Sequence, residues 1–176
     1  IEADRAAVRL FADSGLTFLV ASSFSKNFSL YGERVGALTI VDQSSDASAR
    51  VLSQLKRVIR ASYSTPPTHG GMIVSAVLAD ADLRRDWEAE LGTMRDRIKS
   101  MRTALTAALA ARRPQLDFSF IVRQNGMFSY SGLTADQVQR LRDEAGIYAL
   151  ASGRICVAAL NTRNVDYVAD AIAQVL

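Results

Sequence analysis

The chain has 176 residues, 49% of them hydrophobic, so it is long enough to bury a core and to form one or two domains. Its formal charge of +3 comes from basic residues dispersed among acids rather than from a basic stripe, so we expect no nucleic-acid partner. No apolar run reaches the roughly 18–20 residues that span a bilayer, so we expect no membrane partner and a cytoplasmic location. The single cysteine, Cys156, excludes an internal disulfide and is expected to be a buried thiol.

The first third of the chain has the pattern of an α/β layer. A helical pattern over 4–13 precedes an apolar run of strand length over 16–21, rich in branched and aromatic residues. A second strand over 36–41 and a helix over 45–60 follow. We expect the first strand to be buried, with Lys26 just past its carboxyl end, where α/β sheets collect ligands.

The turn after that strand is rich in serine and contains Lys26. An aldehyde cofactor that forms a Schiff base needs a neutral amine, which partial desolvation or a nearby cation such as Arg34 favours. The hydroxyls of Ser23 and Ser25 and the planar guanidinium of Arg34 suit the oxygens of a phosphate. The turn therefore has the groups that a phosphate-bearing aldehyde needs. The alternative is that Lys26 is a solvated loop lysine and Arg34 a surface charge.

A long helix is expected in the middle of the chain, after a Pro-Pro loop and a short helix over 72–78. Residues 82–111 carry apolar side chains near helical spacing, which we expect to be core. They are Leu83, Trp87, Leu91, Met94, Ile98 and Met101. A helix of about thirty residues is about 45 Å long at 1.5 Å per residue, enough to bridge two domains.

The last third of the chain predicts a small α+β domain. Strands are expected over 118–122, 126–130, 147–150 and 155–158, and helices over 134–145 and 164–176. Gly146 is placed to end the first of these helices, and Thr162 or Asn161 to cap the second.

Three further side chains are candidates for a substrate pocket. Arg60 precedes the Pro-Pro loop, and its alternative role is that of an ordinary helix-terminal arginine. Arg154 lies between a small-residue turn and an apolar run, where its charge needs either a ligand carboxylate or a structural ion pair. Phe128 is either a pocket wall or plain core. His69 is the only histidine, which leaves no convincing metal site or histidine-based triad.

The run SSFSKNFSLYGERVG over 22–36 closely resembles the cofactor-lysine segment of the class I aminotransferases of pyridoxal phosphate, in the aspartate and aromatic amino acid branch. The segments 60–70 and 151–161 are similar to the two segments that carry the family's substrate arginines. The residues at 28–34 are closer to the aromatic amino acid branch than to strict aspartate enzymes.

This resemblance implies a role for each candidate residue. Lys26 would hold pyridoxal 5'-phosphate covalently and then act as the general base and acid. Ser23 and Arg34 would bind the phosphate. The substrate contacts would come from Arg154 on the α-carboxylate, from Arg60 on the distal carboxylate in the partner subunit's active site, and from Phe128 on the pocket wall.

The resemblance also implies a fold type I aminotransferase of the α/β class. Residues 1–80 would be the remaining part of the large cofactor-binding domain, 81–111 a connecting helix and 112–176 a small α+β domain. The implied activity is transfer of an amino group between an aromatic or dicarboxylic amino acid and 2-oxoglutarate in a homodimer, with this chain as the carboxyl-terminal part. The alternatives are an aspartate aminotransferase, or a noncatalytic structural fragment, because the family's side chains for the cofactor ring are not identifiable here.

Overall fold

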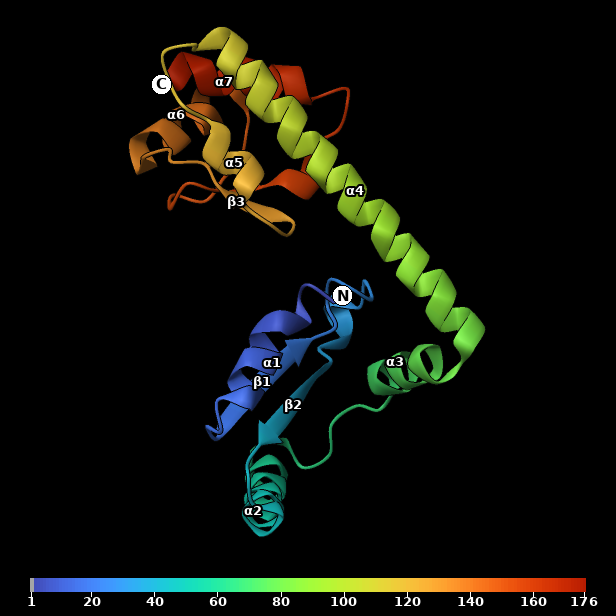
Figure 1. The fold of residues 1–176 in the computed structure, drawn as a ribbon. Coiled ribbons are helices and arrows are strands. Elements are labelled where there is room, and N and C mark those ends of the chain that lie inside the picture. Colours follow the sequence, from blue (N-terminus) through green and yellow to red (C-terminus); the bar gives the residue numbers. More distant parts are fainter. Residues whose placement is uncertain (1) are drawn as a thin grey trace. The chain divides into compact units, whose positions relative to one another are not determined.

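The computed structural model describes residues 2–176, which fall into two compact units. The first unit ends at Trp87 and the second covers Glu88–Leu176, so the boundary lies inside helix α4 (Ala81–Arg112; Figure 1). The domain limits expected from the sequence, at residues 80 and 111, stay a prediction. No helix within residues 2–176 combines the length and the apolar character needed to cross a membrane.

The first unit has the predicted order of helix, strand, strand and helix. It contains α1 (Arg5–Asp13), β1 (Phe18–Ser23), the 3-10 helix η1 (Tyr31–Glu33), β2 (Gly36–Val41), α2 (Ser45–Tyr63) and α3 (His69–Ala79). The two strands pair antiparallel, from Phe18 opposite Val41 to Ser23 opposite Gly36. A Cβ on Gly36 would lie 2.6 Å from the carbonyl oxygen of Ser22, so only glycine allows the chain to approach β1 so closely.

β1 is not the buried strand that the sequence predicts. Its residues alternate between half-buried and exposed and are then fully exposed, and Leu19 is 63% exposed. A two-stranded ribbon cannot cover its own faces, and among the described residues up to Trp87 the buried hydrophobic side chain is Val74 on α3. An apolar run in the sequence shows which residues favour burial. They become buried only where another element packs on them.

α4 confirms the long helix expected in the middle of the chain. Asp80 caps its start, because its Oδ1 accepts the backbone N–H groups of Asp82 and Leu83 at 2.9 Å each. The predicted apolar stripe is buried at Met101, half-buried at Trp87, Leu91 and Ile98, and exposed at Leu83 and Met94. The core prediction is therefore wrong for Leu83 and Met94, because the hydrophobic core packs against α4 only from Ile98 onward.

The second unit has a hydrophobic core of its own. After α4 it contains α5 (Ser119–Arg123), β3 (Phe128–Tyr130), α6 (Ala135–Ala145), β4 (Arg154–Cys156), the 3-10 helix η2 (Val157–Ala159) and α7 (Val165–Val175). The least exposed side chains of the core include Leu105, Leu109, Ile121, Leu141 and Val157. β3 and β4 pair antiparallel, with Phe128 opposite Cys156 and Tyr130 opposite Arg154.

The two predicted helices of this unit are confirmed, and so is one of the two predicted ends. Thr134 and Gln137 form a reciprocal capping box at the start of α6, and Gly146 ends the helix in the left-handed conformation, with φ 62°. At α7 the cap residue is Asn164 rather than Thr162 or Asn161. Its Oδ1 accepts the N–H of Asn161 at 2.7 Å, so the two asparagines close a turn before the helix begins.

Four other expectations for this unit are wrong. Residues 118–122 contain helix α5 instead of a strand, because Asp117 accepts the Ser119 N–H at 2.7 Å and starts a helical turn. Residues 147–150 pair with no strand, and β4 ends at Cys156, where η2 takes over. The side chain of Cys156 is exposed, since it alternates with the half-buried Ile155 along an edge strand.

Candidate active site

The serine-rich turn follows the end of β1 and is held together by hydrogen bonds between its own residues. The backbone N–H of Ser25 donates to Ser23 Oγ at 3.2 Å, and the Ser23 hydroxyl donates to Ser25 Oγ at 3.1 Å. The N–H of Ser29 donates to the carbonyl of Lys26 at 3.2 Å, which completes the turn. Ser25 is only 5% exposed, whereas Ser23 and Lys26 are exposed. The turn therefore presents Lys26 and the hydroxyls of Ser23 and Ser29 to solvent.

Tyr31 links the two cations of this loop. Lys26 Nζ lies 5.8 Å from the centre of the Tyr31 ring, and Arg34 donates from Nη1 to the Tyr31 carbonyl at 3.0 Å. Arg34 adopts a left-handed backbone conformation, with φ 54°, and its side chain is exposed. Lys26 is exposed, so partial desolvation, one of the two alternatives considered from the sequence, is absent within residues 2–176.

Two helices hold this loop in place. The indole N–H of Trp87 on α4 donates to the carbonyl of Asn27 at 2.7 Å, and its ring stacks on Phe28 at 4.6 Å. On α3, a Cβ added to Gly70 would lie 2.9 Å from Glu33 Cβ, so the helix packs directly on the loop. Sequence reasoning assigned Trp87 to the core only. Its role as a support for the residue after Lys26 depends on a contact that spans 60 positions.

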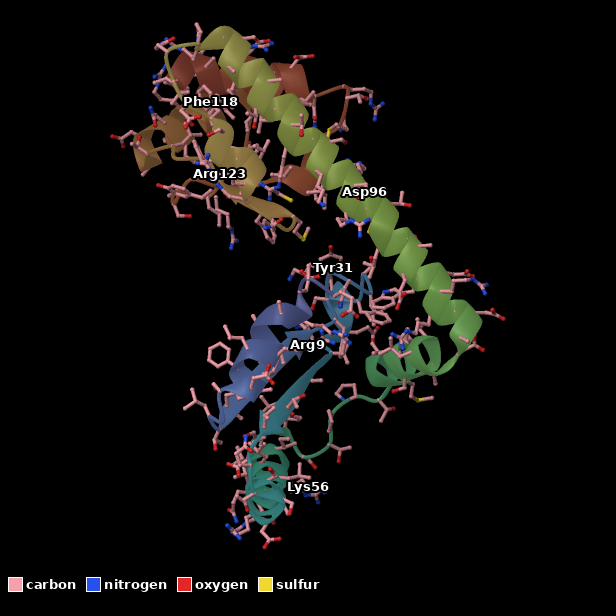
Figure 2. The ribbon with its side chains drawn as sticks, viewed as in Figure 1. Arg9, Tyr31, Lys56, Asp96, Phe118 and Arg123 are labelled. Carbon is pink, nitrogen blue, oxygen red and sulfur yellow. The ribbon has the colours of Figure 1, made fainter. Side chains whose placement is uncertain are left out.

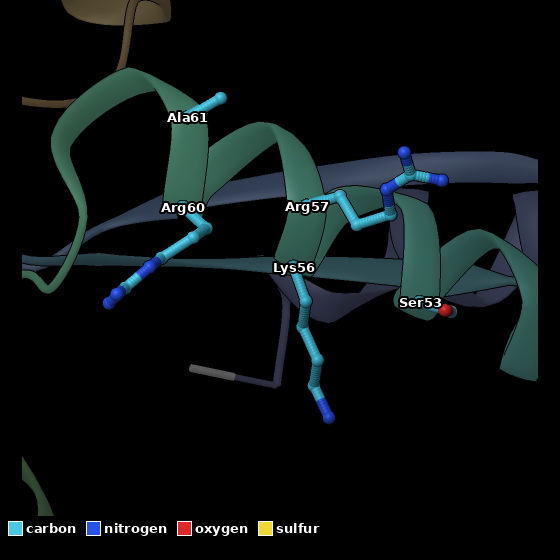
Figure 3. Close-up of a pocket in the computed structure, with 5 residues that line it drawn as sticks. All are labelled: Ser53, Lys56, Arg57, Arg60 and Ala61. Atoms are coloured by element: carbon cyan, nitrogen blue, oxygen red, sulfur yellow. The ribbon is translucent and has the colours of Figure 1, made fainter.

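Arg60 lies in another part of the first unit. It is in the last turn of α2, where Nη1 donates to Ser64 Oγ at 3.2 Å. Together with Ser53, Lys56, Arg57 and Ala61 it lines an open hollow, in which Lys56 and Arg60 extend from the helix to the same side (Figure 3).

The structure does not bring Arg60 next to Lys26. α2 follows the end of β2 at Val41, whereas the Lys26 loop joins the opposite ends of the two strands. In Figure 2, Tyr31 of the loop and Lys56 of α2 accordingly lie at opposite ends of this unit.

The other two predicted site residues meet in the second unit. Phe128 on β3 and Arg154 on β4 come from paired strands, and the guanidinium carbon of Arg154 lies 4.8 Å from the centre of the Phe128 ring. No carboxylate of residues 2–176 forms an ion pair with Arg154, so within these residues the structural ion pair considered as an alternative is absent. Phe128 is 38% exposed, and Arg154 is exposed as well.

A buried arginine that the sequence reasoning missed lies behind this pair. Arg102 on α4 is 3% exposed, and burial lowers the pKa of its guanidinium. A detectable signal exists in the sequence, because position 102 falls on the apolar stripe of α4 formed by Ile98, Leu105 and Leu109, which packs on the core. A charged residue in a helical stripe of apolar residues indicates a buried polar contact.

The chain belongs to the aminotransferase family. The family model described as "Aminotransferase class I and II" matches residues 2–172. Among curated relatives, the aspartate aminotransferase of Pseudomonas aeruginosa is 66% identical over 176 residues, and the aromatic-amino-acid aminotransferase of Escherichia coli is 51% identical over the same length. The chain covers 44% of each of these relatives, so it spans less than half of their length.

Solved structures confirm the α/β fold class expected from the resemblance. The aromatic-amino-acid aminotransferase of Burkholderia pseudomallei, covalently bound to pyridoxal phosphate, matches 99% of the chain with a TM-score of 0.94 and 67% identity. A psychrophilic aromatic amino acids aminotransferase from Psychrobacter sp. B6, cocrystallised with aspartic acid, matches with a TM-score of 0.95 and 49% identity. The chain covers 44% of each of these proteins.

Proposed function

We propose that this chain is part of a pyridoxal-phosphate-dependent aminotransferase, which moves an amino group between an aromatic or dicarboxylic amino acid and 2-oxoglutarate. The observation that carries the proposal is the Lys26 loop. It presents an exposed amine, a serine hydroxyl and an arginine on one short segment that α3 and α4 hold in place. The names of the relatives include both aspartate and aromatic amino acid aminotransferases, which supports both substrate classes.

The residues of the loop fit a phosphate-bearing aldehyde. Lys26 Nζ is exposed and is available for a covalent bond, and Ser23 and Arg34 are exposed donors on the same segment. Ser23 and Arg34 would hold the phosphate, and Lys26 would hold the aldehyde carbon. When bound, the cofactor supplies an electron sink for the substrate carbon. Lys26 would then take and return the proton at the substrate Cα.

The Phe128–Arg154 pair would bind the substrate. A guanidinium without a protein carboxylate is free to make a bidentate contact with the substrate α-carboxylate. Phe128 would support Arg154 from one side and would line the pocket. Arg60 would reach the distal carboxylate in the partner subunit's active site of a cytoplasmic homodimer. Its place on α2, the helix that follows the strand ends opposite the Lys26 loop, is compatible with that role.

Reductive labelling tests the proposal. The protein is incubated with pyridoxal 5'-phosphate and reduced with borohydride, and its intact mass and peptide map are measured. We expect one adduct, at Lys26 and not at Lys56 or Lys99, the other two lysines of the chain. Lys26→Arg should abolish the adduct. Pyridoxal without its phosphate should label Lys26 far less, because Ser23 and Arg34 then have nothing to bind. Equal labelling of all three lysines would contradict the proposal.

A second candidate is that the 176-residue chain on its own is a noncatalytic structural piece. The observation in its favour is the exposed first unit, where Lys26 follows a strand that is half-buried at two of its residues and exposed at the others. Labelling of Lys26 in the longer enzyme but not in the 176-residue chain would support this second candidate for the isolated chain and the aminotransferase proposal for the whole protein.

A further inference from the structure

Arg102 is a buried cation whose contacts are all neutral. Its Nη1 donates to the Ile121 carbonyl at 3.0 Å and to Ser129 Oγ at 2.7 Å. Its Nη2 donates to the carbonyls of Gly126 and Phe128 at 2.7 Å each. Burying a charge without a carboxylate is costly, and an apolar side chain would serve packing at lower cost. An arginine here is therefore explained by the four acceptors that it binds and not by packing alone.

The four acceptors share one location, since all of them lie on residues 121–129. Ser129 in turn donates to Gln124 Oε1 at 2.8 Å, and the same oxygen accepts the Tyr130 N–H at 2.7 Å. Residues 121–129 therefore surround the guanidinium, and Gln124 of the same segment accepts hydrogen bonds from Ser129 and Tyr130. The position of β3 thus depends on the planar fork of Arg102.

The segment that Arg102 holds carries Phe128, whose ring contacts Arg154. Beyond the other strand of the β3–β4 pair, Arg97 of α4 donates to the carbonyls of Ala158 and Leu160 at 3.1 and 2.6 Å. Ala158 and Leu160 follow the end of β4 closely in the chain. Two arginines of one helix therefore hold the strand that carries Phe128 and the segment after the strand that carries Arg154.

We propose that Arg102 is a positioning residue, which fixes Phe128 from behind and so orients the guanidinium of Arg154 toward a substrate carboxylate. The proposal rests on the substrate role of Arg154 proposed above. Lysine cannot replace Arg102, because an ammonium is a single point and cannot place two nitrogens in one plane between four acceptors. Arg102 itself touches no substrate.

The test uses the full-length enzyme with its cofactor and succinate, a dicarboxylate that has no amino group to transfer. The dissociation constant of succinate is measured by calorimetry, and the melting temperature is measured alongside. We expect Arg102→Lys to weaken succinate binding about tenfold. The control is Arg113→Lys, because Arg113 is half-buried and donates two hydrogen bonds, both to the Ala173 carbonyl, away from the β3–β4 pair. The control should lower the melting temperature and leave succinate affinity within about twofold of wild type.

A double-mutant cycle shows whether Arg102 acts through Phe128. Phe128→Leu should also weaken succinate binding, with little loss of melting temperature, because the ring is partly exposed. If the two residues act in series, the double variant binds no more weakly than the weaker single variant. Independent effects that multiply would overturn the proposal, and so would a wild-type dissociation constant in Arg102→Lys.

Two further variants keep the outcomes distinct. If Arg102→Lys fails to fold, Ser129→Ala removes one hydrogen bond of Arg102, and we expect about threefold weaker succinate binding. Unchanged binding would overturn the proposal.

Arg154→Lys tests the substrate role of Arg154, on which the proposal rests. If Arg154→Lys binds succinate normally, both proposals fail. If only Arg154→Lys loses affinity, the positioning role of Arg102 alone fails.

Discussion

Ser29 and Arg34 stand on either side of the η1 turn with left-handed backbone conformations, at φ 55° and 54°. This region costs a residue with a Cβ about 1–2 kcal/mol and is usually left to glycine. Side chains held in such conformations concentrate at binding and catalytic sites, where the surroundings fix the backbone. The loop that carries Lys26 therefore contains strain at two of its own positions.

Replacing Ser29 by glycine tests this strain. We expect Ser29→Gly to raise the free energy of unfolding by about 0.5–1 kcal/mol, because the relief of the left-handed conformation exceeds the entropy that glycine adds to the unfolded chain. Denaturant titration of both proteins measures the difference.

The matched control for Ser29→Gly is Ser22→Gly on β1. Ser22 has an ordinary strand conformation opposite Ala37, so glycine there should destabilise by about 0.5–1 kcal/mol. The same sign of change in both variants would show that backbone conformation is not the cause.

At the scale of the element, α6 is the helix whose ends the sequence predicts best. Thr134 accepts the Gln137 N–H at 3.2 Å, and Gln137 Oε1 accepts the Thr134 N–H at 2.9 Å. Thr134→Ala removes one half of this capping box and should cost about 1 kcal/mol of stability. Thermal unfolding monitored by circular dichroism measures the loss.

Thr103→Ala is the control for Thr134→Ala. Thr103 is exposed in the interior of α4 and bonds only back to the Lys99 carbonyl. Because alanine has the higher helix propensity, this change should be neutral or slightly stabilising. Equal destabilisation by both variants would mean that the cap contributes nothing specific.

The elements that the sequence misassigned are short apolar segments. Residues 118–122 have strand-like alternation but form α5, and residues 147–150 form no strand. A segment of five residues is too short for its hydrophobic pattern to distinguish a helix from a strand. Local hydrogen bonds then decide which of the two forms. For α5 the decisive group is Asp117, which bonds the start of the helix. Longer elements such as α2 and α4 leave no such ambiguity.

At the scale of the whole molecule, the buried core is unequally divided. The core cluster draws all of its buried side chains from Met101 to Val175, whereas Val74 is the buried hydrophobic side chain among the described residues up to Trp87. Opening free energies follow buried apolar contact, so the two units should differ in local stability. We therefore expect the unit that carries Lys26 to be the less stable one in the 176-residue chain.

Hydrogen exchange of the 176-residue chain tests this division. We expect strong amide protection in α6, α7 and the part of α4 after Ile98, and fast exchange in α1, β1 and β2. In the full-length enzyme the strands should become protected as well. Equal protection of both units in the isolated chain would contradict the prediction, and would show that exposure in this structure does not govern local opening.

Much of the candidate site is readable from the sequence. The spacing of Ser23, Lys26 and Arg34 predicts one loop, and the structure places Ser23 at the end of β1 and the other two on the segment between β1 and β2. The supports of that loop are not readable, because Trp87 and Gly70 reach it across long stretches of chain. The same holds for Arg102, whose acceptors lie 19–27 positions away.

The sequence by itself determined the order of most elements, the long helix, the turn of Lys26 and the family resemblance, because these depend on local periodicity and on consecutive residues. The tertiary structure alone decided which apolar residues are buried, that Cys156 and β1 are exposed, that Phe128 lies against Arg154, and that Arg102 stands behind them. Burial and contact depend on residues that are distant in the sequence and come together only when elements pack. No local pattern contains that information.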